Sequence, residues 1–236
     1  MRIIAAVLYL LGAMLYSYPE RWIHYFKYPD EKKRQDANYY SLQRLVRNLL
    51  KLLGIHMEVQ GSTIYEEPVV YIGNHRSNFD SLMMIAMMEK PLIFIGKSEI
   101  KKFPFIGRWF QDIGCLFLER ADNKKSLKVI NEGIDRIRRG YSVVIFPEGG
   151  RTNVDGVKDF KPGSFKLAAR TNVRIVPVTF YNSEACYEKT HWFQPADVRI
   201  RIGEIVDPQA LELQSTVQMA KHLHTVISQD YEEMKK

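Results

Sequence analysis

The chain opens with an almost unbroken apolar run at residues 3–18, IIAAVLYLLGAMLYSY. This run is slightly shorter than the about 20 residues that a membrane-spanning helix needs. Little positive charge precedes it and no clear cleavage site follows, so it is not typical of a signal peptide. We therefore expect a helix that enters or lies in one leaflet of a membrane. A buried core helix is the alternative. Aromatic residues suited to a membrane interface come next: Tyr16, Tyr18, Trp22, Tyr25, Phe26 and Tyr28.

A second helix is predicted to start near Asn38 and to end at Gly54. Its apolar positions recur at intervals of three and four and form one stripe: Leu42, Leu45, Val46, Leu49, Leu50 and Leu53. Basic residues lie at 32–34, 44, 47 and 51. We interpret residues 1–54 as a membrane-binding helical hairpin, although packing of the stripe against a protein core fits the second helix equally well.

From residue 55 onward, short apolar runs alternate with helix-like segments. The clearest helix covers residues 123–139, with Asp122 as its predicted N-cap. Such alternation is typical of an α/β fold with a mixed, mostly parallel sheet flanked by helices. We assign residues 55–236 to this domain. The expected strands are 56–60, 69–73, 92–96, 115–118, 143–146, 175–180 and 198–202.

The charge of the chain bounds its partners. The net charge is +7 and the pI is near 9.3, which favours anionic partners such as phosphorylated substrates, coenzyme A, anionic lipid or nucleic acid. The two cysteines, Cys115 and Cys186, do not make a disulfide framework, so we expect a reducing compartment. No cluster of histidine and cysteine has zinc spacing, so no metal is expected.

Candidate chemistry lies at residues 74–80, NHRSNFD, directly after the apolar run 69–72. Loops that follow the carboxyl ends of strands are where α/β proteins place their sites. His75 and Asp80 can meet if the histidine is in the loop and the aspartate in the first helical turn. The carboxylate would then fix the ring tautomer and leave the other ring nitrogen as a base.

Two further segments add cations near the same sheet edge. Lys97 ends one predicted strand, and Arg120 follows the next one. The run VVIFPEGGRT at 143–152 leads a strand into a loop that holds Glu148, Gly149 and Arg151. Glycine lets the backbone approach a ligand, and an arginine can bind phosphate oxygens in a bidentate manner. Glu148 could accept from a hydroxyl or orient a cation.

These segments resemble the glycerolipid acyltransferases, and most closely the 1-acylglycerol-3-phosphate acyltransferases. The four matching blocks are Asn-His-x-Ser-x-x-Asp at 74–80, the block from Lys97 to Arg120, the Phe-Pro-Glu-Gly segment with Gly150 in place of the usual threonine, and the proline-containing strand 175–179. A lone cation is ordinarily just solvated, and it is the resemblance that assigns Lys97 and Arg120 to a site.

The resemblance implies direct acyl transfer to the free hydroxyl of 1-acylglycerol 3-phosphate, which gives phosphatidic acid. His75 would be the base and Asp80 its orienting acid. The acceptor would be bound by Lys97, Arg120, Glu148, Gly149 and Arg151. The donor would be acyl-CoA or acyl carrier protein, with no other cofactor and no nucleic acid. The enzyme would lie on a membrane, with its catalytic domain on the cytoplasmic side of a bacterial inner membrane.

Several alternatives remain open. The same chemistry could act on another lysophospholipid or alcohol. A non-catalytic membrane-binding module would explain the charge and the apolar start, and a metal-dependent hydrolase would use His75 and Asp80 as ligands. Ser77 and Cys115 are candidate nucleophiles for a covalent route. The methionines at 83, 84, 87 and 88 could line an acyl tunnel, although core packing is the more ordinary interpretation.

Overall fold

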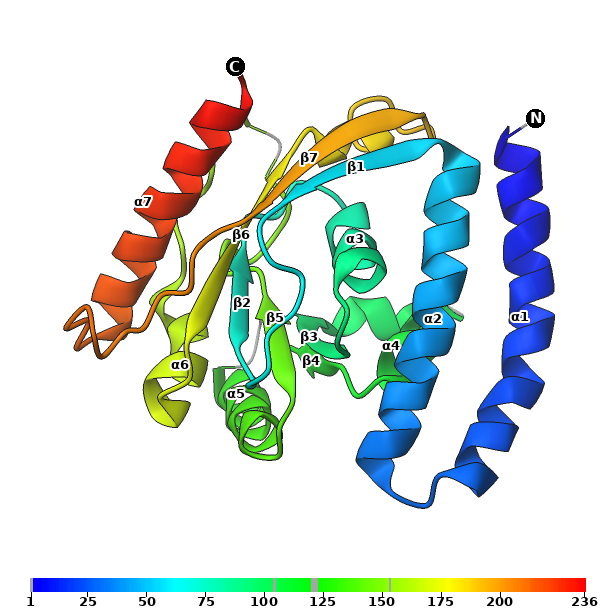
Figure 1. The fold of residues 1–236 in the computed structure, drawn as a ribbon, viewed down its shortest axis with the longest axis horizontal. Helices are drawn as coiled ribbons and strands as arrows, with labels where there is room; N and C mark the ends of the chain where they lie inside the picture. Colours follow the sequence, from blue (N-terminus) through cyan, green and yellow to red (C-terminus); the bar gives the residue numbers. More distant parts are fainter. Residues whose placement is uncertain (1, 104, 120–122, 153) are drawn as a thin grey trace.

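A single sheet organises the computed structural model, which describes residues 2–103, 105–119, 123–152 and 154–236. Over these ranges the sheet has seven strands in the order β1-β7-β6-β2-β5-β3-β4 (Figure 1). All neighbouring strands are parallel except β6 and β7. The predicted mixed, mostly parallel sheet is therefore confirmed. The strands are β1 (Ile55–Gln60), β2 (Val70–Gly73), β3 (Leu92–Lys97), β4 (Leu116–Leu118), β5 (Ser142–Ile145), β6 (Ile175–Tyr181) and β7 (Ala196–Ile202).

Helices cover both faces of this sheet (Figure 1). Val69 and Tyr71 belong to one apolar cluster, whereas Val70 and Ile72 belong to the other. This alternation follows from the strand geometry, in which successive side chains point to opposite faces. The helices are α1 (Arg2–Lys27), α2 (Glu31–Leu53), α3 (Phe79–Met87), α4 (Ile106–Asp112), α5 (Asn123–Arg138), α6 (Lys166–Thr171) and α7 (Thr216–Met234), with short 3-10 turns η1 (Ser98–Lys102), η2 (Pro162–Phe165) and η3 (Ser183–Cys186).

Helix α2 begins earlier than the sequence pattern predicted, at Glu31 rather than near Asn38. Asp30 is its N-cap and accepts a hydrogen bond from the backbone of Lys33. The prediction was wrong because the first two turns carry mostly polar residues, so the apolar stripe starts later than the helix does. The predicted end is confirmed, since Gly54 takes the left-handed conformation at the C-cap.

The apolar stripe of α2 packs against α3. The side-chain amide of Gln43 donates to the carbonyls of Ile85 and Met88, at 2.7 and 2.6 Å. Arg47 donates to the carbonyl of Ala86. These bonds satisfy carbonyl groups that the end of a helix leaves without partners. Helix α2 therefore shares a core with the sheet, while the division of the chain at residue 54 stays a prediction.

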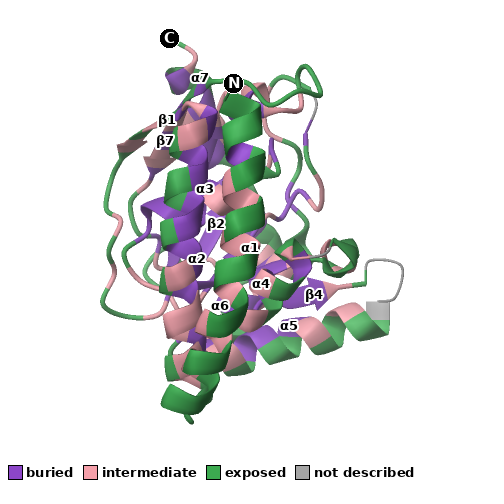
Figure 2. Cartoon of the chain, turned by 90° about the vertical axis from the view of Figure 1, so that its right-hand side faces the viewer, coloured by how far each residue is buried: buried purple, intermediate pink, exposed green. Residues whose placement is uncertain are grey.

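Helix α1 lies alongside α2 and is largely exposed (Figure 2). Ala6 is its one residue classed as buried among those that the structure describes. By length and composition, α1 is apolar enough to cross a membrane. Only 6% of its most apolar stretch of 18 residues is buried in the protein. A core helix would show the opposite burial, so α1 presents apolar surface of the kind that associates with membranes.

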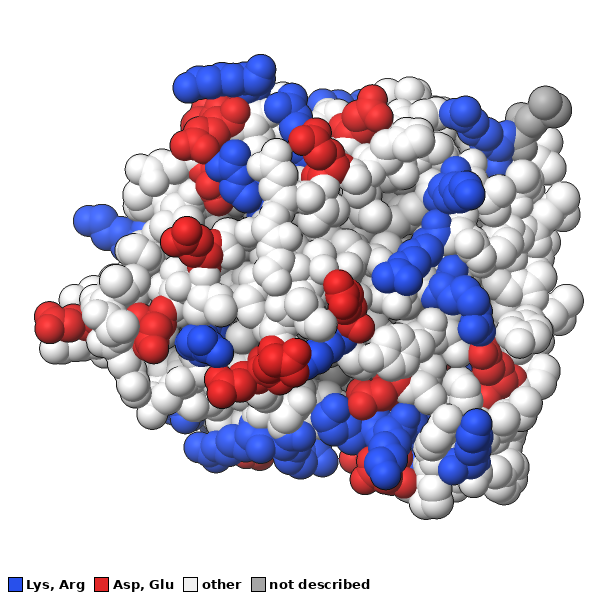
Figure 3. All heavy atoms as spheres, viewed as in Figure 1, with Lys and Arg blue, Asp and Glu red and all other residues white. Residues whose placement is uncertain are grey.

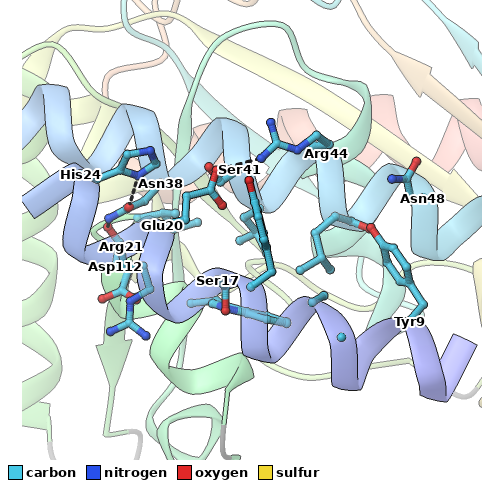
Figure 4. Close-up of a pocket in the computed structure, with 17 residues that line it drawn as sticks. Tyr9, Ser17, Glu20, Arg21, His24, Asn38, Ser41, Arg44, Asn48 and Asp112 are labelled. Carbon is cyan, nitrogen blue, oxygen red and sulfur yellow. Dashed lines mark hydrogen bonds and ion pairs between the residues drawn. The ribbon is translucent and has the colours of Figure 1, made fainter. Parts of the chain in front are cut away.

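Polar pairs tie the second half of α1 to the rest of the protein (Figure 4). Arg21 pairs with Asp112 at 2.7 Å, and His24 bonds with Asn38 at 2.8 Å. A third pair joins Glu20 to Arg44 at 2.8 Å. Together these contacts border a hollow of about 330 Å³ between α1, α2 and α4. With the packing of Tyr9, Leu10 and Ala13 against the core, they fix the place of α1 on the domain, even though others of its apolar side chains are exposed.

Basic side chains follow the place of α2 on the face that Figure 3 shows. Arg44, Arg47 and Lys51 are all exposed on α2. Each cation near an anionic membrane surface contributes roughly 1 kcal/mol of attraction. The charge and the exposed apolar helix therefore favour the same partner, a negatively charged lipid surface.

We expect the double variant Leu8→Glu/Leu15→Glu to lose at least about tenfold in affinity for vesicles that contain anionic lipid, because burying a leucine is worth roughly 1.5–3 kcal/mol. The two side chains are 63% and 77% exposed, so the fold should persist. Vesicle co-sedimentation measures the effect. The matched control is Val217→Glu on α7, where the side chain is 62% exposed. Equal binding of both variants and the parent would contradict a membrane role for α1.

Candidate functional site

The turn between β2 and α3 is anchored at its first residue. Asn74 is completely buried, and its side-chain amide donates to the carbonyl of Phe180 while its oxygen accepts from the Phe180 N–H, at 2.9 and 2.8 Å. This pair of bonds copies the ladder between neighbouring strands and ties the turn to β6. The next residue, His75, is thereby held at the carboxyl edge of the sheet.

His75 and Asp80 meet as their spacing predicted. Nδ1 of His75 lies 2.9 Å from Oδ2 of Asp80, which is in the first turn of α3. The same oxygen accepts the backbone N–H groups of Arg76 and Ser77, each at 2.8 Å. A carboxylate can only accept, so Nδ1 carries the proton and Nε2 is the basic nitrogen. The geometric expectation is confirmed, while the catalytic role stays a prediction.

The histidine ring is also held from its flat side. It stacks on Phe146 with ring centroids 4.4 Å apart and an interplanar angle of 15°. The side chain of His75 is 19% exposed, and Asp80 is completely buried. The ring is thus fixed by one hydrogen bond and one stacking contact, and part of it still reaches an adjoining cavity.

Glu148 supports the backbone of His75. Its Oε1 accepts the His75 N–H at 2.8 Å, and its Oε2 accepts the hydroxyl of Thr152. The Thr152 N–H donates in turn to the His75 carbonyl at 2.8 Å. Burial raises the pKa of Glu148, although the bond from Thr152 opposes the rise. Glu148 therefore has two partners inside the protein, and its predicted contact with a substrate stays a prediction.

Gly149 owes its place to the conformation of the loop. Its φ is +76°, a backbone conformation that residues other than glycine rarely adopt. A Cβ there would lie 2.6 Å from Nζ of Lys161. The lysine side chain therefore rests on the glycine. The predicted close approach of Gly149 to a ligand is a separate hypothesis that stays untested.

A cavity of about 300 Å³ adjoins the histidine and brings the predicted cations to it. Lys97, at the end of β3, and Arg151 both line this cavity with His75. Arg120 and Asp122 lie outside the described residues. The rest of the wall is largely apolar and aromatic, and includes Phe94, Ile100, Phe103, Phe110, Phe117 and Phe146.

The methionines of α3 belong to the core rather than to this cavity. Met83, Met84 and Met87 of α3, and Met88 directly after it, are at most 9% exposed and pack in the cluster that contains the α2 stripe. The structure therefore agrees with core packing, the more ordinary interpretation of these methionines. Aromatic side chains from β3, α4 and β4 form the cavity wall instead.

The two candidate nucleophiles are poorly placed for a covalent route. Ser77 is completely buried, and its hydroxyl donates to Glu188 at 2.6 Å. Cys115 is buried and accepts from the backbone of Phe94. Burial raises the pKa of the Cys115 thiol far above its usual range, so little thiolate exists near neutral pH.

A buried ion pair holds the turn from its far side, and sequence reasoning missed it. Nε and Nη2 of Arg76 donate to the two carboxylate oxygens of Glu184, at 2.8 and 2.9 Å. Burial alone would raise the pKa of Glu184, but its bonds with Arg76 outweigh burial and lower it. The partners are 108 residues apart, so no local pattern signals the pair. Among the described residues, no group of three histidine, cysteine, aspartate or glutamate side chains is arranged to hold a metal ion.

Comparisons with known proteins agree with this arrangement. A sequence model of the Acyltransferase family matches residues 56–181. A probable 1-acyl-sn-glycerol-3-phosphate acyltransferase of Mycoplasma genitalium is 26% identical over 87% of this chain and 80% of its own length. The 1-acyl-sn-glycerol-3-phosphate acyltransferase of Borreliella burgdorferi is 28% identical, over 72% of this chain and 69% of its own.

A solved structure shares the fold. The crystal structure of the 1-acyl-sn-glycerophosphate acyltransferase PlsC from Thermotoga maritima superposes with a TM-score of 0.78 at 23% identity, over 100% of this chain and 98% of that one. The match of the family model covers more than half of the chain, and it includes the turn that carries His75 and Asp80. The chain therefore belongs to the acyltransferase family.

Proposed function

We propose that this acyltransferase moves a fatty acyl chain from a thioester to the free hydroxyl of 1-acylglycerol 3-phosphate, forming phosphatidic acid. One observation carries the proposal: a histidine oriented by a buried aspartate shares a cavity with a lysine and an arginine. Such a cavity offers a base for a hydroxyl and cations for a phosphate on the same molecule. The names of the relatives support this acceptor.

The chemistry assigned to His75 is general base catalysis. Nε2 removes the proton of the acceptor hydroxyl as that oxygen forms its bond to the thioester carbonyl carbon. The carbon–sulfur bond then breaks, and the imidazolium returns the proton to the leaving thiolate. Asp80 stabilises the imidazolium through Nδ1. A positioned base of this kind contributes roughly 10²- to 10⁴-fold in rate.

The cations are assigned to the acceptor phosphate. Lys97 and Arg151 line the cavity with His75, and the family resemblance adds Arg120 to them. Binding the phosphate fixes where the hydroxyl lies relative to Nε2, which lowers the entropic cost of the reaction. In this proposal Glu148 and Gly149 shape the loop that presents Arg151, so their contribution to acceptor binding is made through the loop.

The donor is assigned as acyl-CoA or acyl carrier protein, with no other cofactor. The aromatic wall of the cavity would take the acyl chain, because it offers apolar surface next to the base. Exposed apolar positions on α1 and cations on α2 would place this cavity near the cytoplasmic face of a bacterial inner membrane. Both substrates could then be drawn from a surface that already concentrates lipid.

The first test is formation of phosphatidic acid from oleoyl-CoA and 1-oleoylglycerol 3-phosphate by the purified protein in lipid or detergent. His75→Ala should lower kcat at least about 10²-fold, since it removes the base. The control is His222→Ala, on α7 and away from the cavity, which should keep parent activity. Circular dichroism establishes that both variants fold.

Activity that survives in His75→Ala would refute the base assignment. A parent that leaves 1-oleoylglycerol 3-phosphate unchanged but acylates another lysophospholipid would move the proposal to that acceptor. A parent inactive with every lysolipid and with both thioester donors would favour the membrane-binding module.

The buried position of Glu148 predicts a pH dependence of stability. Its folded pKa is raised by burial, so its contribution to the free energy of unfolding is complete below the ordinary glutamate pKa and is lost as pH rises through the folded value. Glutamine does not ionise. The stability of Glu148→Gln relative to the parent should therefore increase from pH 4 to pH 7, whatever its constant offset.

Urea unfolding at several pH values measures this difference. The control is Glu66→Gln, because the Glu66 side chain is 85% exposed and pairs with Lys90 on the surface. A relative stability of Glu148→Gln that stays constant or falls as pH rises would contradict the assignment.

A further inference from the structure

Glu188 links the two halves of the site, although it lies beyond the stretch that matches the family model. Its Oε2 accepts the Ser77 hydroxyl at 2.6 Å. Its Oε1 accepts the Asn78 N–H at 3.0 Å and Nη1 of Arg151 at 2.9 Å. The first two contacts belong to the turn that carries His75, and the third belongs to the loop that follows β5.

The charge of Glu188 is well compensated where it lies. Its side chain is 12% exposed, and Asn78 is the N-cap residue of α3. A helix N-terminus favours negative charge, because its first N–H groups have no partner within the helix. The carboxylate therefore lies where backbone N–H groups and the guanidinium of Arg151 meet.

Arg151 is a long and partly exposed side chain that a fixed partner can hold in place. Its side chain is 41% exposed, and ordering a long arginine side chain on a ligand costs conformational entropy. The guanidinium has five N–H donors in a fixed plane. A bond from Nη1 to Glu188 uses one side of this fork and still leaves other donors that a phosphate could accept.

We propose that Glu188 is a positioning residue for the acceptor: it holds Arg151 at the cavity and, through Ser77 and Asn78, sets the distance between that guanidinium and His75. The proposal rests on the proposed function, in which Arg151 binds the acceptor phosphate and His75 activates its hydroxyl. One carboxylate thereby couples the phosphate-binding group to the base. A substrate that carries both groups at a fixed spacing benefits from that coupling.

The test begins with Glu188→Gln, which keeps the shape and one accepting oxygen but removes the charge. The KM for 1-oleoylglycerol 3-phosphate should rise about fivefold, as expected for a half-exposed charge pair worth about 1 kcal/mol. The kcat should change less than about threefold, because the bond from the Asn78 N–H survives. The inhibition constant of glycerol 3-phosphate, used as a competitive inhibitor, should rise by the same factor.

A double-variant cycle separates positioning from a general effect on the fold. If Glu188 acts through Arg151, then Glu188→Gln adds less than about twofold to the KM of Arg151→Gln. The control for removing a carboxylate is Glu66→Gln, because Glu66 forms an exposed ion pair with Lys90. KM effects that multiply in the double variant would overturn the proposal, and so would a fall in kcat with KM unchanged.

Failure of the proposed function gives a different result. If the parent does not acylate 1-oleoylglycerol 3-phosphate, binding of glycerol 3-phosphate by calorimetry replaces the kinetic assay. Binding to the parent that weakens about fivefold in Glu188→Gln would still support the positioning role. Equal binding to both proteins, or binding to neither, would overturn it.

Discussion

The hydrogen bond between the Asp80 carboxylate and Nδ1 of His75 is the contact on which the site depends. One oxygen of Asp80 accepts hydrogen bonds from that ring nitrogen and from two consecutive backbone N–H groups. The conformation of the turn and the orientation of the base therefore have a single cause. Asp80 can play this part because it is buried in the first turn of α3. That position requires α3 to pack between the sheet and α2, whose Gln43 and Arg47 bind the carbonyls at the other end of α3. The base is thus oriented by packing that extends to the N-terminal helices.

Three carboxylates of the site bind the backbone of the turn, whereas two of its cations line the cavity. Asp80, Glu148 and Glu188 each accept backbone N–H groups of residues 75–78, and all three are largely shielded from solvent. Lys97 and Arg151 line the cavity itself. These three acids therefore hold the turn in shape, whereas Lys97 and Arg151 face the cavity, whose lining also includes one acid, Glu99. This division gives Glu148 a role in supporting the base that its motif position alone does not suggest.

The sequence predicted the elements whose signals are local. The alternation of apolar runs indicated the sheet, and the spacing of His75 and Asp80 indicated their contact, because a loop residue and a first-turn residue are brought together by the chain itself. The start of α2 was missed, since polar residues on a solvated turn carry no periodic signal. Glu184 and Glu188 were missed because their partners in the turn, Arg76 and Ser77, lie more than 100 residues away and meet them only through the order of the strands. The antiparallel pairing of β6 and β7 is likewise a property of the assembled sheet.

The account is tested most directly by kcat for Asp80→Asn. An asparagine can place its oxygen where Oδ2 lies, so that it still accepts the ring N–H of His75 and the N–H groups of Arg76 and Ser77. The turn and the ring orientation are then kept, but the negative charge that stabilises the imidazolium is lost. We predict that kcat falls at least about 10²-fold with the KM for the acceptor within about threefold. A kcat within about tenfold of the parent would show that the reaction does not depend on the charge of Asp80 beside His75.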